Sequence, residues 1–104
     1  MCADDLTPLV AGWLVERVAA GVTDARSTLA LAGDPDGVSR IASVAKLPVG
    51  MAALVAVEEG TIELDERAGP PGSTVRHLLA HASGLPFDGD AVMARPGRRR
   101  IYSN

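Results

Sequence analysis

Hydrophobic positions in the first third of the chain follow a helical repeat and then two short apolar runs. Apolar residues recur every three or four positions over residues 7–21, which predicts an amphipathic helix with one buried face. A run within residues 26–32 predicts a strand, and a stretch rich in turn residues separates it from a second run at residues 38–41. We therefore expect a helix followed by a β-hairpin.

The middle of the chain is its most hydrophobic part. Residues 47–57 are almost wholly apolar and predict a buried helix, since eleven residues fall well short of the roughly 20 that cross a bilayer. Residues 61–66 alternate enough to predict a brief extended segment. A short helix should then run from a cap at Ser73 or Thr74 to His81, after which no periodicity is visible.

Composition narrows the class of protein. The 104 residues are 47% hydrophobic and 22% charged, as in one globular domain or part of one. A net charge of −3 argues against a nucleic-acid partner. Cys2 is the single cysteine, which excludes an internal disulfide framework. The acidic start lacks the basic region of a secretion signal, so we expect a cytoplasmic protein as written, whereas a longer parent could be extracytoplasmic.

Ser43 and Lys46 are the first candidates for chemistry. They stand three residues apart at the start of the predicted buried helix, so their side chains share one face. A hydroxyl beside an amine has the arrangement of a nucleophile and its base, and a helix N-terminus stabilises a developing oxyanion. Lys46 is the only lysine, and arginine could not accept a proton in its place. Alternatively, Ser43 caps the helix and Lys46 extends into solvent.

Tyr102 and Asn104, the only tyrosine and the only asparagine, form the second candidate pair. In an extended segment, residues two apart point the same way, although an ordinary turn is the alternative. Holding tyrosine or lysine as a free base at pH 7 costs about 4 kcal/mol, so each benefits from the other. Either a cationic Lys46 favours the Tyr102 phenolate, or a buried neutral Lys46 accepts the Ser43 proton. Asn104 would orient the base or hold a substrate carbonyl.

Three motifs in order resemble those of the class C β-lactamase-like serine hydrolases, which include penicillin-binding D-alanyl-D-alanine carboxypeptidases and esterases. The motifs are IASVAK at 41–46, HLLAHASGLP at 77–86 and YSN at 102–104. The resemblance implies an α+β fold, the N-terminal part of a β-lactamase/transpeptidase-like fold, mostly helical with a short β-hairpin. The family's Lys/His-Thr/Ser-Gly strand is absent. We therefore expect residues 1–104 to be a single partial domain, truncated before that C-terminal sheet motif, with apolar surface exposed.

The resemblance also implies roles for the candidate residues. Ser43 would be the acylated nucleophile, Lys46 its proton partner, Tyr102 the general base and Asn104 a positioning residue. The implied reaction is hydrolysis of a small-molecule ester, amide or β-lactam through an acyl-enzyme, without a cofactor or metal. The motif at 77–86 is structural in that family, so we assign it no chemistry.

The two histidines and the arginine run are better explained without a functional site. His77 and His81 are one helical turn apart, but no third ligand follows at a suitable spacing, so we expect no metal site. The arginine run 98–100 suits a solvated loop better than a site that binds a carboxylate.

The alternative function is a non-catalytic truncated relative, or a packing module without a complete active site. The missing strand would supply an oxyanion donor, and loss of one such donor costs about 3 kcal/mol of transition-state stabilisation. The oligomeric state is not predicted.

Overall fold

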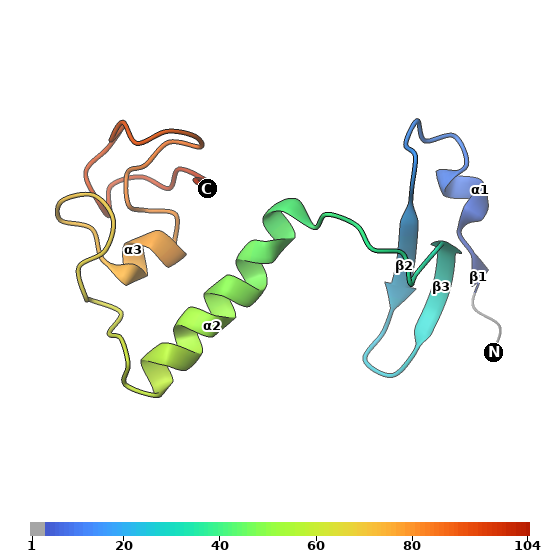
Figure 1. The fold of residues 1–104 in the computed structure, drawn as a ribbon, viewed down its shortest axis with the longest axis horizontal. Coiled ribbons are helices and arrows are strands. Elements are labelled where there is room, and N and C mark those ends of the chain that lie inside the picture. The colour runs from blue at the N-terminus through green and yellow to red at the C-terminus, as the bar shows by residue number, and fades with distance from the viewer. Residues whose placement is uncertain (1–3) are drawn as a thin grey trace. The chain divides into compact units, whose positions relative to one another are not determined.

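The computed structural model describes residues 4–104, so Cys2 lies outside the described residues. The chain divides into two compact units, Met1–Arg40 and Ile41–Asn104 (Figure 1). Its elements, in chain order, are β1 (Asp4–Asp5), α1 (Thr7–Val10), β2 (Ala19–Thr23), β3 (Thr28–Gly33), the 3₁₀ helix η1 (Ala42–Ala45), α2 (Lys46–Glu58) and α3 (Val75–Leu79). The fold is α+β with one small sheet, as the sequence predicts.

The sheet of the first unit is built around β3. Its strand order is β1-β3-β2, with β1 parallel and β2 antiparallel to β3. Asp24 Oδ1 closes the β2–β3 turn by accepting the backbone N–H groups of Arg26 and Ser27, both at 2.7 Å. These bonds lower the pKa of the Asp24 carboxyl, since they favour its charged form. The predicted partner strand of this hairpin is therefore wrong. β3 pairs with β2, which precedes it, and residues 38–41 form no strand.

The helix predicted over residues 7–21 is wrong beyond its first turn. Only α1 is helical, and the later part of the range contributes to β2. Gly12 weakens a helix here by about 1 kcal/mol relative to alanine, and short helices are marginal without packing. Pairing with β3 satisfies the backbone groups instead. Val10 is buried, whereas Trp13 and Leu14 on the expected core face are exposed.

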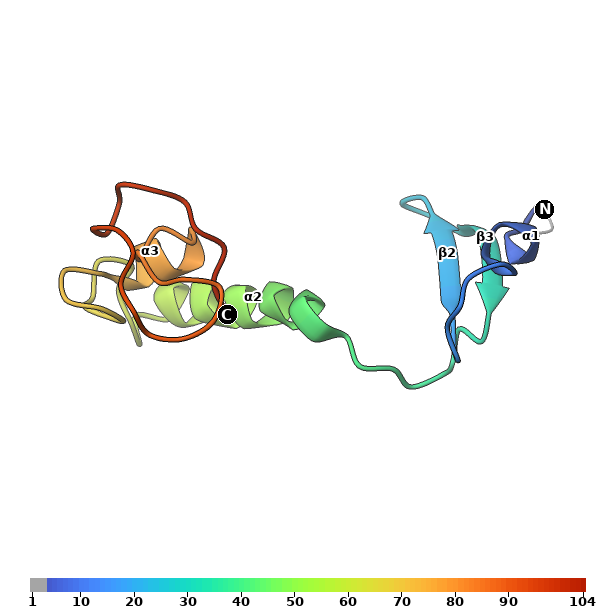
Figure 2. The ribbon, with the colours of Figure 1, turned by 90° about the horizontal axis from the view of Figure 1, so that it is seen from above.

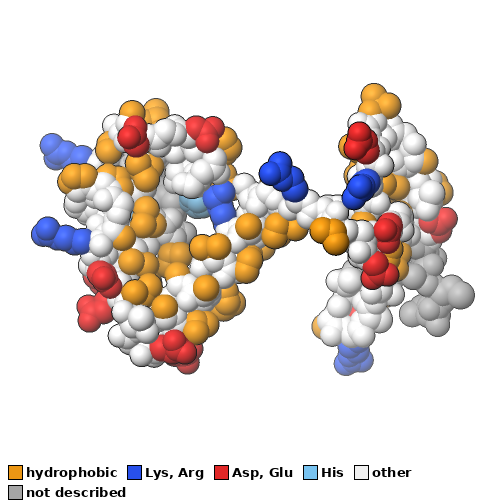
Figure 3. Space-filling view, in the orientation of Figure 1, with side chains coloured by type: hydrophobic (Ala, Val, Ile, Leu, Met, Phe, Trp, Pro, Cys, Tyr) orange, Lys and Arg blue, Asp and Glu red, His pale blue; other side chains and the backbone are white. Residues whose placement is uncertain are grey.

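The helix predicted over residues 47–57 is confirmed as α2, which η1 precedes directly. Pro48 falls in its first turn, where its missing N–H costs little. The prediction that α2 is buried is wrong, because no described segment encloses it: none of its residues is buried, and Leu47 is 74% exposed. The expected exposed apolar surface is thus confirmed, and Figure 3 shows many such side chains on this unit.

No helix in the described part of the chain combines the length and apolarity that crossing a bilayer requires.

In the second unit, residues 61–66 form turns, and the predicted extended segment there is wrong. The N–H of Glu66 donates to the carbonyl of Glu63 at 3.1 Å, and the N–H of Val75 returns to the carbonyl of Glu66 at 3.0 Å. These bonds tie the connection between α2 and α3 to the start of α3.

The predicted short helix is confirmed as α3, with Thr74 as its cap. The Thr74 hydroxyl accepts the N–H of His77 at 3.5 Å, and His77 Nδ1 accepts the N–H of Thr74 at 3.2 Å, which completes a capping box. The helix ends at Leu79, earlier than predicted. His81 is already left-handed, with a φ of 54°, and turns the chain away.

Gly84 anchors the irregular C-terminal segment. Its φ is 93°, and a Cβ atom there would lie 2.0 Å from the carbonyl oxygen of Ala94. The Gly84 carbonyl accepts the N–H of Met93 at 2.8 Å, and the Ala82 carbonyl accepts that of Gly97 at 2.8 Å. Main-chain hydrogen bonds therefore hold the final residues against the segment that follows α3.

Gly84→Ala tests this anchor against Gly89→Ala, since Gly89 has a similar φ of 87° but no atom within 4 Å of its added Cβ. The left-handed backbone costs both variants about 1–2 kcal/mol. Gly84→Ala should lose a further ~1–3 kcal/mol through overpacking. Urea unfolding followed by circular dichroism measures the difference. Equal destabilisation of the two variants would contradict the close approach at Gly84.

Candidate active site

The second unit brings together the four residues predicted to carry chemistry. Ser43 lies in η1 and Lys46 is the first residue of α2, while Tyr102 and Asn104 lie in the irregular C-terminal segment. In Figures 1 and 2 that segment runs back past α3 toward the start of α2. Residues 58 positions apart thereby meet at one helix end, as the bond from Lys46 to Asn104 requires.

Lys46 is the centre of this cluster. Its Nζ donates to Ser43 Oγ at 3.2 Å and to Asn104 Oδ1 at 2.9 Å. Asn104 Nδ2 donates in turn to Asp88 Oδ1 at 3.0 Å, which sets the orientation of the amide. Lys46 is half-buried and bonded within the site, in contrast to the alternative of an amine extended into solvent.

Ser43 is held by local backbone geometry. It is the second residue of η1, whose first turn has no side-chain cap, so its hydroxyl is engaged by Lys46 rather than by a backbone N–H group. Ala42, directly before it, has a φ of 44°, a conformation that residues with a Cβ rarely adopt. Such strain recurs at functional sites, where the surrounding structure enforces it.

Tyr102 lies beside the other three residues and is 42% exposed. Lys46 Nζ is 5.0 Å from the centre of its ring, within the range of a cation–π contact. The neighbouring Ser43 hydroxyl, followed by the Lys46 amine, lowers the pKa of the Tyr102 phenol, because both favour the phenolate. Lys46 Nζ donates its hydrogen bonds to Ser43 and Asn104. Lys46 therefore lowers the pKa of the phenol through the closeness of its amine to Tyr102.

Aromatic neighbours hold the Tyr102 ring in place. His81 stacks on it with 4.6 Å between ring centres, and Phe87 lies 5.9 Å away on a similar plane. His81 Nδ1 also accepts the N–H of Ser103 at 3.2 Å. The sequence alone predicted none of these contacts. His81 stood within a motif treated as structural, and no pattern pointed to Phe87 or Asp88.

A pocket opens next to Lys46 and Asn104, between α2 and the segment after α3. Its other walls are mainly apolar and include Val49, Leu79 and Leu85. An apolar chemical group could therefore lie beside the charged end of Lys46.

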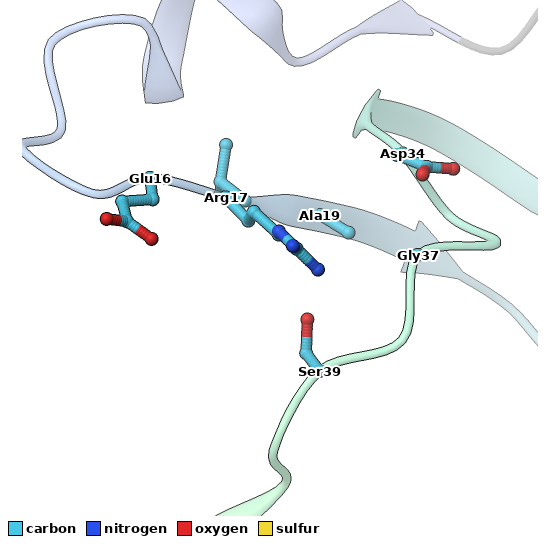
Figure 4. Close-up of a pocket in the computed structure, with 7 residues that line it drawn as sticks. Glu16, Arg17, Ala19, Asp34, Gly37 and Ser39 are labelled. Atoms are coloured by element: carbon cyan, nitrogen blue, oxygen red, sulfur yellow. The ribbon is translucent and has the colours of Figure 1, made fainter.

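The first unit has a separate pocket, formed by the end of the loop before β2 and the turn after β3 (Figure 4). The side chains of Arg17 and Ser39 point toward one another there, with Glu16 and Asp34 at its sides. The pocket has charges of both signs but no hydroxyl bonded to a base. Within residues 4–104 no group of three potential metal ligands comes together. The candidate active site therefore lies in the second unit.

Comparisons with known proteins identify the family of the chain. The family model described as beta-lactamase matches residues 8–104. The crystal structure of a beta-lactamase from Mycobacterium bovis is similar over 92% of this chain, with 54% sequence identity and a TM-score of 0.83. No match was found among curated protein sequences.

The aligned part is about a third of the solved protein, since it covers 35% of that chain. At 54% identity the likeness extends to sequence as well as fold, and the family match includes all four clustered residues. The expected family is therefore confirmed: this chain belongs to the beta-lactamase family.

Proposed function

We propose that this chain carries the nucleophile and the proton-transfer groups of an acyl-transferring hydrolase that acts on an ester, amide or β-lactam. One observation carries the proposal: Lys46 Nζ bonds both Ser43 Oγ and Asn104 Oδ1, with the Tyr102 phenol alongside. A hydroxyl, an amine and a phenol of lowered pKa in one cluster suit nucleophilic catalysis. No step of this reaction requires a cofactor.

In the proposed first step, Ser43 Oγ forms a bond to the substrate carbonyl carbon and passes its proton to the Tyr102 phenolate. The Ser43 hydroxyl and the Lys46 amine both lower the pKa of the Tyr102 phenol, which favours Tyr102 as the acceptor. Collapse of the tetrahedral intermediate breaks the bond to the leaving group, which takes the proton from Tyr102. Water then attacks the Ser43 ester by the reverse sequence and releases the acid.

The surroundings support the same reaction. Ser43 lies at the start of the continuous helical segment formed by η1 and α2, where free N–H groups and the positive end of the helix dipole favour an oxyanion. The Asn104 amide accepts from Lys46 through Oδ1 and donates to Asp88 through Nδ2. We therefore assign Asn104 to positioning Lys46, and the second hydrogen of its Nδ2 could still hold a substrate carbonyl. The apolar pocket beside them would take an apolar part of the substrate.

The second candidate is a non-catalytic relative or packing module. It is favoured by the exposed apolar surface of α2 and by the 35% coverage of the solved relative. We propose that residues 1–104 are a partial domain, in which the described residues supply only the oxyanion donors at the helix start. Loss of one donor costs about 3 kcal/mol, so reaction at Ser43 should be slow.

A serine-reactive phosphonate tests the nucleophile. We expect weak labelling of the 104-residue chain, carried by Ser43, with intact mass and peptide mapping as the measurement. Ser43→Ala should abolish the adduct. Ser39→Ala, which removes an exposed hydroxyl of the first unit, should leave it unchanged. Equal labelling of wild type and Ser43→Ala would refute the assignment, and no adduct in any variant would favour the packing module.

The titration of Tyr102 tests the proton route, since phenolate absorbance reports this one tyrosine. Its midpoint should lie below that of free tyrosine. Ser43→Ala and Lys46→Met should each raise it, whereas Arg26→Met removes a charge from the β2–β3 turn and should not. The lowered pKa stabilises the folded state above pH ~10, and this effect is lost as pH falls through the folded-state pKa. An unshifted midpoint in wild type would remove Tyr102 as the base.

A further inference from the structure

We propose that His81 is a positioning residue of this site, which holds Tyr102 and Asn104 against Lys46 through its ring, its Nδ1 atom and its backbone carbonyl. The inference rests on the proposed function, since it names what keeps the general base in place. His81 touches neither Ser43 nor Lys46 by a hydrogen bond among residues 4–104, so it acts through Tyr102 and its neighbours.

His81 contacts the Tyr102 segment at three successive residues. Its carbonyl accepts the N–H of Ile101 at 2.8 Å, and its Nδ1 accepts the N–H of Ser103 at 3.2 Å. Between these two bonds, its ring stacks on that of Tyr102 at 4.6 Å with an interplanar angle of 26°. The backbone on both sides of Tyr102 and the ring itself are therefore set by one residue.

The Ser103 bond also assigns the form of the imidazole. Since Nδ1 accepts a hydrogen bond, it carries no proton, and the neutral ring has its proton on Nε2. Ser103 is only 9% exposed, so water has little access to replace this acceptor. Loss of the acceptor would leave a part-buried N–H group unpaired and free the residue between Tyr102 and Asn104.

The backbone of His81 carries a cost that its contacts offset. Its φ of 54° is left-handed, a conformation uncommon for residues with a Cβ, though less so for histidine, asparagine and aspartate. That turn directs the His81 carbonyl toward Ile101 and its ring toward Tyr102. His77, one helical turn earlier, uses its Nδ1 within the α3 capping box instead and provides a matched control.

The test uses the 104-residue protein and needs no reactivity at Ser43. In wild type, imidazole nitrogen shifts should show Nδ1 unprotonated in His81 at neutral pH. His81→Phe keeps an aromatic ring but removes the acceptor. It should speed exchange of the Ser103 amide by roughly tenfold or more and move the Tyr102 phenolate midpoint toward that of free tyrosine. His81→Asn offers an acceptor and suits the left-handed backbone, so it should restore slow Ser103 exchange.

His77→Gln keeps a side-chain acceptor for the cap and should change neither Ser103 exchange nor the Tyr102 midpoint. A proton on Nδ1 in wild type would overturn the proposal, even if His81→Phe fails to fold. Unchanged Ser103 exchange and an unchanged Tyr102 midpoint in folded His81→Phe would do the same. If Ser43 takes up no label while these results hold, His81 still positions Tyr102 and the proposed catalysis is what fails.

Discussion

The bridge that Lys46 makes between Ser43 and Asn104 organises the second unit. One bond spans a single helical turn, and the other joins the start of α2 to the last residue of the chain. A side chain with three donors and no acceptor suits this task, because one amine can bind a hydroxyl and a carbonyl together. The position of Tyr102 follows, since it lies two residues before the amide that Lys46 holds.

The irregular segment reaches this bridge through backbone contacts rather than regular secondary structure. Gly84 and His81 both adopt left-handed conformations after α3, and their carbonyls accept N–H groups of Met93 and Ile101. These bonds replace the pairing that a helix or strand would supply. A motif that is structural by family resemblance thus contributes directly to the geometry of the site.

Helix α2 joins a polar site to an apolar body. Between Lys46 and Glu58 at its two ends, the helix carries no polar side chain on any face, yet no described segment buries it. Its first residue, Lys46, faces Ser43 and Asn104. The apolar side chains of α2 therefore form an exposed surface directly beside the polar cluster.

Local signals in the sequence determined α2, the cap of α3 at Thr74 and the pairing of Ser43 with Lys46, since each depends on residues within one or two turns. The helix predicted over residues 7–21 does not extend beyond its first turn. Pairing of β2 with β3 outweighs the weak helix propensity of this glycine-containing segment. Tyr102 and Asn104 could be singled out by type and by resemblance, but their meeting with Lys46 depended on a chain path of 58 residues. Tertiary structure alone decided the parts of His81 and Asp88, because such long-range contacts leave no periodic trace along the chain.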